Sequence, residues 1–444
     1  MRLFIRAYHP AADGITPDTA LFQQAIDELA AQGGGTLVVE PGRYLLGGLH
    51  LPSNFCLQLD AGAELIASAD YDDFAQNTTV SVAELSDRAF LYARQQRNIT
   101  LSGQGKIIGN ADAYFSAQPD EQGYRLPARH RPRILVLEDC EKVKIQGVTI
   151  ENAPMWTVHL VSCRQVNVER LTVDNDMTMA NTDALNLDSC QDVTVRDCHL
   201  SAADDALCIK TTAKPPAIQY KAQRMTVSHC RLRSRSCALK IGTETFADIE
   251  DLTVSHCAIY DSNRGIGLIS RDGGAFRRIC FSDITFECVA APPCHWGKAD
   301  PIFISVRYRD PAIEPGVVED VRFVRLSGVS EGAINLHSTP AGYIRHIHFD
   351  DITLEQRPSH SPEQGLYDVR PPCNPARPTG MGLDNAYLVN PDTGRAYGVE
   401  TYPTGLPALF ARGVNDLTWH KMTLQRPSPL PVGWSPDAIV ELAE

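Results

Sequence analysis

Short segments that alternate apolar and polar residues recur along this chain. Ten such segments, each four residues long, begin at Asn98, Lys142, Gln165, Asp192, Arg224, Asp251, Arg278, Asp320, His346 and Asp416. Their apolar second residues are separated by 44, 23, 27, 32, 27, 27, 42, 26 and 70 positions. A period of two within a segment predicts a β-strand, and recurrence every ~20 to 50 residues is typical of repeat architectures.

Stacking of such strands, coil upon coil, predicts an all-β right-handed parallel β-helix. Helical repeats of ~33 or more residues fit this spacing poorly, and the sequence lacks the Leu-x-x-Leu-x-Leu frame of leucine-rich repeats. The long gaps of 44, 42 and 70 residues would hold inserted loops. Loops on a rigid scaffold are where such folds usually carry function.

The cysteines follow the same repeat. Two sets stand at matched positions beside the repeat strands: Cys140, Cys163 and Cys190 before them, and Cys198, Cys230 and Cys257 after them. We expect ladders of small buried side chains inside the solenoid. Thirteen cysteines without a Cys-x-x-Cys pair predict free thiols in a reducing compartment and no structural zinc site.

The N-terminal sequence and the composition restrict the expected cellular location and the expected classes of partner. MRLFIRAYHPAADG has no apolar segment followed by a small-residue cleavage site, and no run approaches the ~18 apolar residues of a membrane span. We therefore expect a cytoplasmic protein with no membrane partner. The net charge of −13 argues against nucleic acid, and also against a long polyanionic substrate unless a local basic site offsets it.

We expect one β-helix domain over residues 1–444, since each coil of a solenoid packs only on its neighbours. Residues 15–35 predict a helix that caps the first coil, with Thr16 or Asp18 at its start and a glycine run at its end. Residues 357–412, rich in proline and glycine, predict long loops over one face. Residues 413–444 would form the last coil and a tail.

Three aspartates stand out in two successive repeats. Asp183 lies in NTDALNLDSC, and Asp204 and Asp205 lie in LSAADDALCIKTT, 204 − 183 = 21 residues later. Matched positions of stacked coils lie ~4.8 Å apart, so the three carboxylates should form one cluster. Like charges raise one pKa, and a glycosidase needs a protonated acid beside an ionised base. The alternative is that these aspartates cap turns at coil corners.

Several motifs resemble a known family. The stretch from DGITPDTALF to AELIAS looks like the opening of the pectin-hydrolase superfamily. RPRILVLEDCEKVKIQGVTIENAPMWTVHL, NTDALNLDSC and ADDALCIKTT resemble glycoside hydrolase family 28, the polygalacturonase family, and the likeness covers roughly residues 11–290. The resemblance implies that Asp204 is the general acid, that Asp183 and Asp205 activate the water, and that configuration is inverted. No metal or other cofactor is implied.

The sequence departs from the family in two places. Where polygalacturonases carry Gly-His-Gly, Cys237 replaces the histidine. Where they carry Arg-Ile-Lys, which grips the uronate carboxylate, Gly267 and Ile269 take the cation positions. Lys240 and Arg271 are cations nearby but displaced. We therefore expect the sugar at subsite −1 to be recognised differently, and action on plain polygalacturonate to be weak.

Seven residues are candidates for binding the substrate: Lys240, Glu244, Arg271, Asp272, Trp296, Arg307 and Tyr308. Each has an alternative. Lys240 would face either solvent or the carboxylates, and Glu244 with the Arg271–Asp272 pair would otherwise form a salt-bridged corner. Arg307 and Tyr308 would form a sugar-binding wall or an exposed strand. Trp296 suits stacking on a sugar ring. Trp156 and His159 are expected to be structural.

The sequence thus predicts an inverting family 28 type hydrolase for pectin-derived or related oligosaccharides. Exo action is expected, because a cytoplasmic enzyme would meet imported oligosaccharides. Three alternatives stay open: a polysaccharide lyase on the same fold with Lys240 or Arg271 as base, a hydrolase for a neutral or deoxy sugar branch, and a non-catalytic β-helix binding protein. Assembly into a homo-oligomer is also open.

Overall fold

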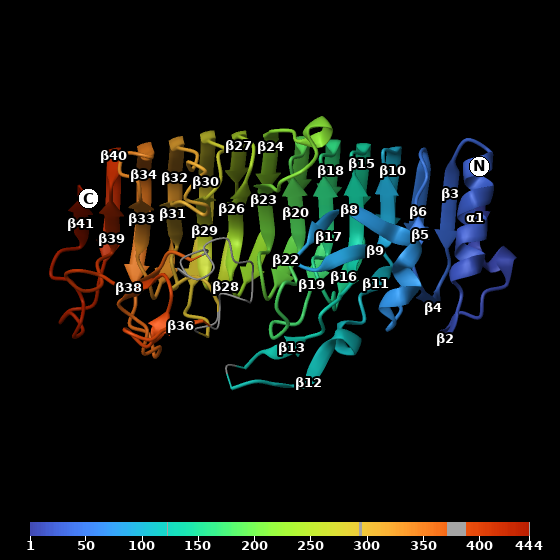
Figure 1. The fold of residues 1–444 in the computed structure, drawn as a ribbon, viewed down its shortest axis with the longest axis horizontal. Helices are drawn as coiled ribbons and strands as arrows, with labels where there is room; N and C mark the ends of the chain where they lie inside the picture. The colour runs from blue at the N-terminus through green and yellow to red at the C-terminus, as the bar shows by residue number, and fades with distance from the viewer. Residues whose placement is uncertain (122, 293–294, 371–387, 444) are drawn as a thin grey trace. The chain divides into compact units, whose positions relative to one another are not determined.

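The computed structural model describes residues 1–444 except 122, 293–294, 371–387 and 444. The chain divides into two compact units. The first holds Met1–Ala203 with Lys214–Tyr220, and the second holds Asp204–Ala213 with Lys221–Glu444. Both units are built from parallel strands stacked in coils (Figure 1). The prediction of a single domain over 1–444 stays a prediction.

In the first unit, most strands belong to two parallel faces. One face contains β1 (Arg2–Phe4), β2 (Asp13–Pro17), β3 (Gly35–Val39), β4 (Gly42–Leu46), β6 (Phe55–Leu59), β7 (Ala63–Ala67), β10 (Arg97–Gly103), β11 (Lys106–Ile108), β15 (Glu141–Gln146), β16 (Thr149–Glu151), β18 (Arg164–Glu169), β19 (Thr172–Asp174), β21 (Gln191–Arg196) and β22 (His199–Ala202). The other contains β5 (Leu49–His50), β9 (Ser86–Arg94), β14 (Arg133–Glu138), β17 (Val158–Val161) and β20 (Leu185–Asp188). Two antiparallel additions are β8 (Thr78–Ala83) on β9 and the hairpin of β12 (Phe115–Pro119) with β13 (Arg125–Pro127). Short 3₁₀ helices occupy Ile5–Tyr8, Tyr71–Asn77, Ala111–Tyr114 and Pro216–Ile218.

The second unit repeats this arrangement. One face contains β24 (Ala222–Ser228), β25 (Arg231–Ser234), β27 (Ile249–Ser255), β28 (Ala258–Ser262), β30 (Phe276–Cys288), β32 (Val318–Ser330), β34 (Ile344–Gln356) and β40 (Val414–Gln425). The other contains β23 (Leu207–Thr211), β26 (Cys237–Thr245), β29 (Arg264–Ser270), β31 (Ile302–Val306), β33 (Ile334–Ser338), β39 (Leu409–Arg412) and β41 (Ile439–Leu442). Two small antiparallel pairs are β35 (Leu366–Asp368) with β38 (Val399–Thr401) and β36 (Val389–Asn390) with β37 (Arg395–Ala396).

The predicted repeat register is confirmed within each unit. In the first unit the second residues of the repeat segments pair in order, Ile99 with Val143 and Val143 with Val166. In the second unit the second residues also pair in order, from Met225 with Leu252 up to Ile347 with Leu417 on β40. All ten first residues of the segments have a positive φ, between 52° and 59°. Each segment therefore begins with a left-handed residue that lies inside its strand, one or two residues after the strand starts.

Apolar side chains fill the interior of the coils in each unit. In the second unit the rings of Phe281, Phe323 and Phe349 stack at centroid distances of 5.1 and 5.0 Å. The six cysteines of the predicted ladders are all buried. All cysteines of the described chain are free thiols, two of them half-buried and the rest buried. A cysteine side chain is small and apolar enough to fill a corner of a coil, which explains why both sets of ladder cysteines are buried.

The capping helix is shorter than predicted. α1 runs Thr19–Ala31, whereas residues 15–17 of the predicted helix belong to β2. Asp18 precedes the helix but its carboxylate accepts from the backbone NH groups of Ala11 and Ala12, at 2.7 and 3.0 Å, instead of capping the helix. In the described part of the chain, no helix is long and apolar enough to cross a membrane.

The predicted loop region 357–412 holds more strand than expected. Its last residues form β39, a coil strand that pairs with β33 and β41. The two small antiparallel pairs, β35 with β38 and β36 with β37, come before β39 in the same region. Residues 371–387 of this region lie outside the described residues.

Candidate active site

The motif with the first aspartate belongs to the first unit, in the turn that leads into β20. Asp183 is 2% exposed. The neighbouring Thr182 Oγ1 accepts a hydrogen bond from the backbone NH of Ala203 at 3.3 Å. Asp204 follows Ala203 in the chain, so this contact ties the turn of Asp183 to the residue that precedes the aspartate pair.

Asp204 and Asp205 begin the second unit, directly before β23. The backbone NH of Asp205 donates to Asp204 Oδ1 at 3.0 Å, and Ser234 Oγ donates to the Asp204 carbonyl at 2.6 Å. Asp205 Oδ2 accepts a hydrogen bond from Lys240 Nζ at 2.7 Å, and both of these side chains are buried. One of two adjacent carboxylates is therefore ion-paired, and the other, Asp204, is only half-buried.

The two aspartates are electrostatically unequal. Burial, and then the negative charge of Asp205, raise the pKa of Asp204 to about 6. Burial disfavours the charged form of Lys240, but the Asp205 carboxylate outweighs it and raises the pKa of this lysine above its ordinary value. Around pH 6, the site thus combines a carboxyl that is partly protonated with a carboxylate paired to a cation.

The two departures from the polygalacturonase pattern pack against each other. Burial, and then the charge of Asp205, raise the pKa of the Cys237 thiol to about 12, so this residue is neutral. A Cβ atom added to Gly267 would lie 2.9 Å from Cys237 Sγ and 3.3 Å from Arg264 Cδ. Gly267 is the register partner of Lys240 and faces the same side of the sheet, where a Cβ atom would crowd the Cys237 thiol.

The second unit contains two further ion pairs among the candidate residues. Lys210 Nζ lies 3.4 Å from Glu244 Oε2, and Arg309 Nε lies 3.2 Å from Asp272 Oδ1. Burial favours the neutral form of Glu244, but the charges of Lys210, Arg309 and Lys240 outweigh it and lower the pKa to about 2. Glu244 and Asp272 are therefore both ion-paired with cations. The sequence offers a salt-bridged corner as the alternative for these residues, but the partner of Asp272 is Arg309.

The predicted cations differ in their surroundings. Arg271 is fully buried and donates to the carbonyls of Ser270, Ser305 and Val369, at 2.9, 3.1 and 2.9 Å, and to Ser305 Oγ. Lys240 is 6% exposed and lies beside Asp205, so the alternative in which it faces solvent is wrong. Binding of substrate by either cation stays a prediction.

The remaining candidates, Trp296, Arg307 and Tyr308, also lie in the second unit. The Trp296 ring centroid lies 5.9 Å from Lys240 Nζ, which places an aromatic face beside the ion-paired lysine. Tyr308 is 40% exposed, and Arg307 Nη1 lies 3.8 Å from Glu400 Oε1. Their roles in sugar binding stay predictions.

The two residues expected to be structural are buried in the first unit. Trp156 is 6% exposed, and its ring meets that of His159 edge to face at 4.9 Å. His159 Nε2 lies 3.1 Å from Asp188 Oδ2, whose other oxygen pairs with Lys214 at 2.5 Å. Both expectations are confirmed.

Sequence reasoning missed three residues that shape this region: Lys210, Arg309 and His337. Lys210 stands inside the quoted motif ADDALCIKTT, so its position beside the aspartates was a usable signal. Arg309 lies two residues after a named candidate. His337 carries no local signal, because its surroundings come from strands distant in sequence.

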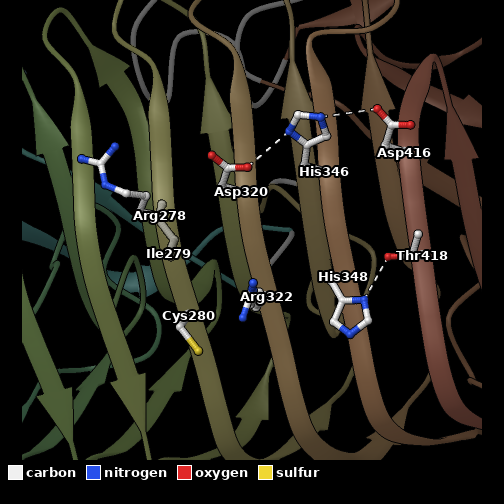
Figure 2. A pocket seen from close by; sticks show the side chains of 9 residues that line it. All are labelled: Arg278, Ile279, Cys280, Asp320, Arg322, His346, His348, Asp416 and Thr418. Carbon is white, nitrogen blue, oxygen red and sulfur yellow. Dashed lines mark hydrogen bonds and ion pairs between the residues drawn. The ribbon is translucent and has the colours of Figure 1, made fainter.

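A separate hollow of about 780 Å³ lies on the outer face of β30, β32, β34 and β40 (Figure 2). There His346 is placed between two carboxylates, with Nδ1 3.2 Å from Asp320 Oδ1 and Nε2 3.5 Å from Asp416 Oδ2. His348 Nδ1 meets Thr418 Oγ1 at 2.9 Å. These contacts link side chains of adjacent coils, and we assign the hollow no chemistry.

Comparison with known proteins identifies the motifs. The sequence profile of the glycosyl hydrolases family 28 matches residues 47–364. A probable polygalacturonase of Vitis vinifera is 26% identical in an alignment of 334 positions that covers 68% of this chain and 66% of that protein, about two-thirds of its length. An exopolygalacturonase of Zea mays is 19% identical over 78% of this chain and 81% of its own.

Solved structures share the fold. The exopolygalacturonase of Thermotoga maritima superposes with a TM-score of 0.67 at 20% identity, over 80% of this chain and 87% of its own. The family 28 exopolygalacturonase of Yersinia enterocolitica gives a TM-score of 0.71 at 17% identity, over 100% of this chain and 78% of its own. These similarities confirm the predicted right-handed parallel β-helix.

Proposed function

The chain belongs to the glycosyl hydrolases family 28, and on this basis we propose that it cleaves pectin-derived oligosaccharides by a single displacement that inverts configuration. The glycoside hydrolase class, of the polygalacturonase type, follows from the family. The substrate, the stereochemistry and the exo mode are the proposal.

The observation that carries the proposal is the inequality of Asp204 and Asp205. Asp204, with a pKa of about 6, donates its proton to the leaving glycosidic oxygen. Asp205, which is ion-paired with Lys240 at 2.7 Å, accepts the proton of the attacking water. The family resemblance assigns activation of the water to Asp183 as well. A proton-holding acid beside an ionised base is what hydrolysis of a glycosidic bond requires.

The same geometry favours hydrolysis over elimination. A lyase needs a neutral basic group to remove a proton from the sugar ring. Lys240 is ion-paired with Asp205, which raises its pKa and keeps it charged. Arg271 is buried and donates to backbone carbonyls. Neither cation is suited to act as the base of a lyase.

Short substrates fit the charge and the setting that we propose. The chain carries a net charge of −13, which repels a long polyanion at moderate salt. We also propose a cytoplasmic location, in which the enzyme would act on imported oligosaccharides from their ends. Exopolygalacturonases among its structural neighbours support this mode.

The test is turnover of a panel of pectin-derived di- and trisaccharides, with product masses measured for the wild type and for Asp204→Asn. We expect saturated products, one sugar released from an end at a time, and loss of turnover in the variant. Unsaturated products would indicate a lyase, and release of internal fragments would contradict the exo mode.

A further inference from the structure

We propose that two copies of this chain associate through β40, the last strand of its face in the second unit. The free edge of β40 in one copy pairs antiparallel with the same edge in the second copy. The sequence leaves assembly into a homo-oligomer open, and this inference names the surface. It is independent of the proposed function, because no substrate and no catalytic group takes part.

Within the described residues, β40 is paired on one side only. It runs parallel to β34, from Val414 opposite Ile344 to Gln425 opposite Glu355, and no described strand joins its other edge (Figure 1). The strands before it, β30, β32 and β34, are each paired on both sides. A long strand edge of this kind presents backbone NH and carbonyl groups that another strand can pair with.

The inward-facing side chains of β40 lack the cover that the preceding coil has. On β34, Ile347 and Phe349 are fully buried, and β40 is the strand that follows them in register. Their register partners on β40 are Leu417, which is only half-buried, and Trp419, which is 40% exposed. Burial of apolar surface drives most association between proteins, so this uncovered row favours a further strand.

Basic and acidic side chains alternate along the outer face, and the alternation ends on β40. The first residues of the last six repeat segments are, in order, Arg224, Asp251, Arg278, Asp320, His346 and Asp416. Arg278 pairs with Asp251 at 2.6 Å, and His346 lies between Asp320 and Asp416 (Figure 2). Asp416 thus ends the row, and the next position in the alternation calls for a basic group.

The sequence of β40 is complementary to itself around Thr418. In an antiparallel pairing centred on this residue, Asp416 lies opposite His420 of the second copy, and Leu417 lies opposite Trp419 of the second copy. Opposite residues of an antiparallel pair share one face of the sheet, so polar side chains meet polar ones and apolar side chains meet apolar ones. A shift by one residue would place Leu417 opposite His420, which mixes the two faces.

The histidine is placed to supply the missing basic group. His420 Nδ1 lies 3.0 Å from Asp350 Oδ1 on β34, so Nε2 is the ring nitrogen that meets Asp416 of the second copy. Both His420 and Asp416 are exposed. A two-fold axis makes this contact twice and uses both free edges, so the assembly closes at two copies. These local contacts act against the repulsion between two chains of net charge −13.

The test measures the mass of the full chain by sedimentation at a series of protein concentrations, without substrate. We expect a monomer–dimer equilibrium. His420→Asp places an acid opposite Asp416 of the second copy, and Asp416→Lys places a base opposite His420. Each should raise the dissociation constant ~10-fold or more, since the unfavourable pair occurs twice. The double variant Asp416→Lys/His420→Asp restores opposite charges and should restore the dimer.

The matched control is His256→Asp. His256 is also exposed and also lies near an aspartate of the next coil, with Nε2 4.0 Å from Asp283 Oδ2. It follows β27, however, which is paired on both sides. The same substitution there should leave the dissociation constant unchanged.

A chain that stays monomeric at every concentration would overturn the inference, and so would a dimer that neither single variant weakens. Species that grow beyond the dimer would indicate a head-to-tail contact and contradict the shared edge. A double variant that dissociates as readily as the single variants would contradict the register. Because the double variant carries both substitutions, its recovery would show that the single variants do not lose the dimer through misfolding.

Discussion

Replacing Asp204 with asparagine is expected to abolish turnover and, at alkaline pH, to stabilise the fold. Asparagine keeps the size of the side chain and an oxygen that can accept from the Asp205 NH, now at 3.0 Å. It removes only the proton and the charge. Loss of the general acid should lower kcat by ~10²–10⁴-fold.

The gain in stability follows from the raised pKa of Asp204, which burial and the charge of Asp205 move from 3.8 to about 6. A raised pKa means that the folded state favours the protonated carboxyl. Protonated Asp204 therefore adds to the free energy of unfolding. This added stability is complete below pH 3.8 and is lost as the pH rises through about 6. At higher pH the charged Asp204 costs the folded state up to about 3 kcal/mol, from ~1.36 kcal/mol for each pKa unit. Asparagine avoids this cost.

The assay compares thermal melting of the wild type and Asp204→Asn at pH values well below and well above 6. The control is Asp197→Asn, which changes an aspartate whose side chain is 43% exposed and should alter neither property. The variant should gain Tm over the wild type only at the higher pH. A variant that keeps more than about a tenth of the activity, a smaller loss than the weakest general acid provides, would refute the assignment. A Tm difference independent of pH would refute the electrostatic reasoning.

Three other predictions follow from the second unit. Lys240→Met should move the alkaline limb of the kcat/KM profile to higher pH, because Lys240 lowers the pKa of Asp204; an unmoved limb would show that the two groups do not interact. Phe323→Ala, in the stack with Phe281 and Phe349, should cost ~3–5 kcal/mol in unfolding free energy with kcat unchanged, measured by denaturant unfolding, and a cost near zero would contradict the core assignment. Cleavage of long polygalacturonate should be at least ~10-fold slower in kcat/KM than cleavage of the best short oligosaccharide, since Gly267 and Ile269 carry no charge for its carboxylates; equal values would contradict this.

The coil register could be predicted from the sequence because it is a local property. Each repeat segment begins with a left-handed residue near the start of its strand, followed by alternating apolar and polar residues, and both features repeat along the chain. The pairing of Val143 with Val166 follows directly from that pattern. The aspartate pair was equally visible, because Asp204 and Asp205 are adjacent in sequence.

The partners of these carboxylates could not be predicted in the same way. Lys240 reaches Asp205 across 35 residues, and whether its side chain points to the carboxylate or to solvent depends on the strand's orientation within the coil. The contact of Arg309 with Asp272 depends on the path of the chain after β31. His337 gains its cationic surroundings from three different segments. Such contacts arise from the packing of coils and leave no pattern in any one of them.

The central claim is that this site hydrolyses a glycosidic bond by single displacement with Asp204 as the acid. The most direct measurement is proton NMR of a pectin-derived trisaccharide during cleavage, which records the anomer of the new reducing end before it equilibrates. We predict that the first product has the configuration opposite to that of the cleaved bond, and that no product forms with Asp204→Asn. A first product that retains the configuration, or that carries a double bond, would contradict the account.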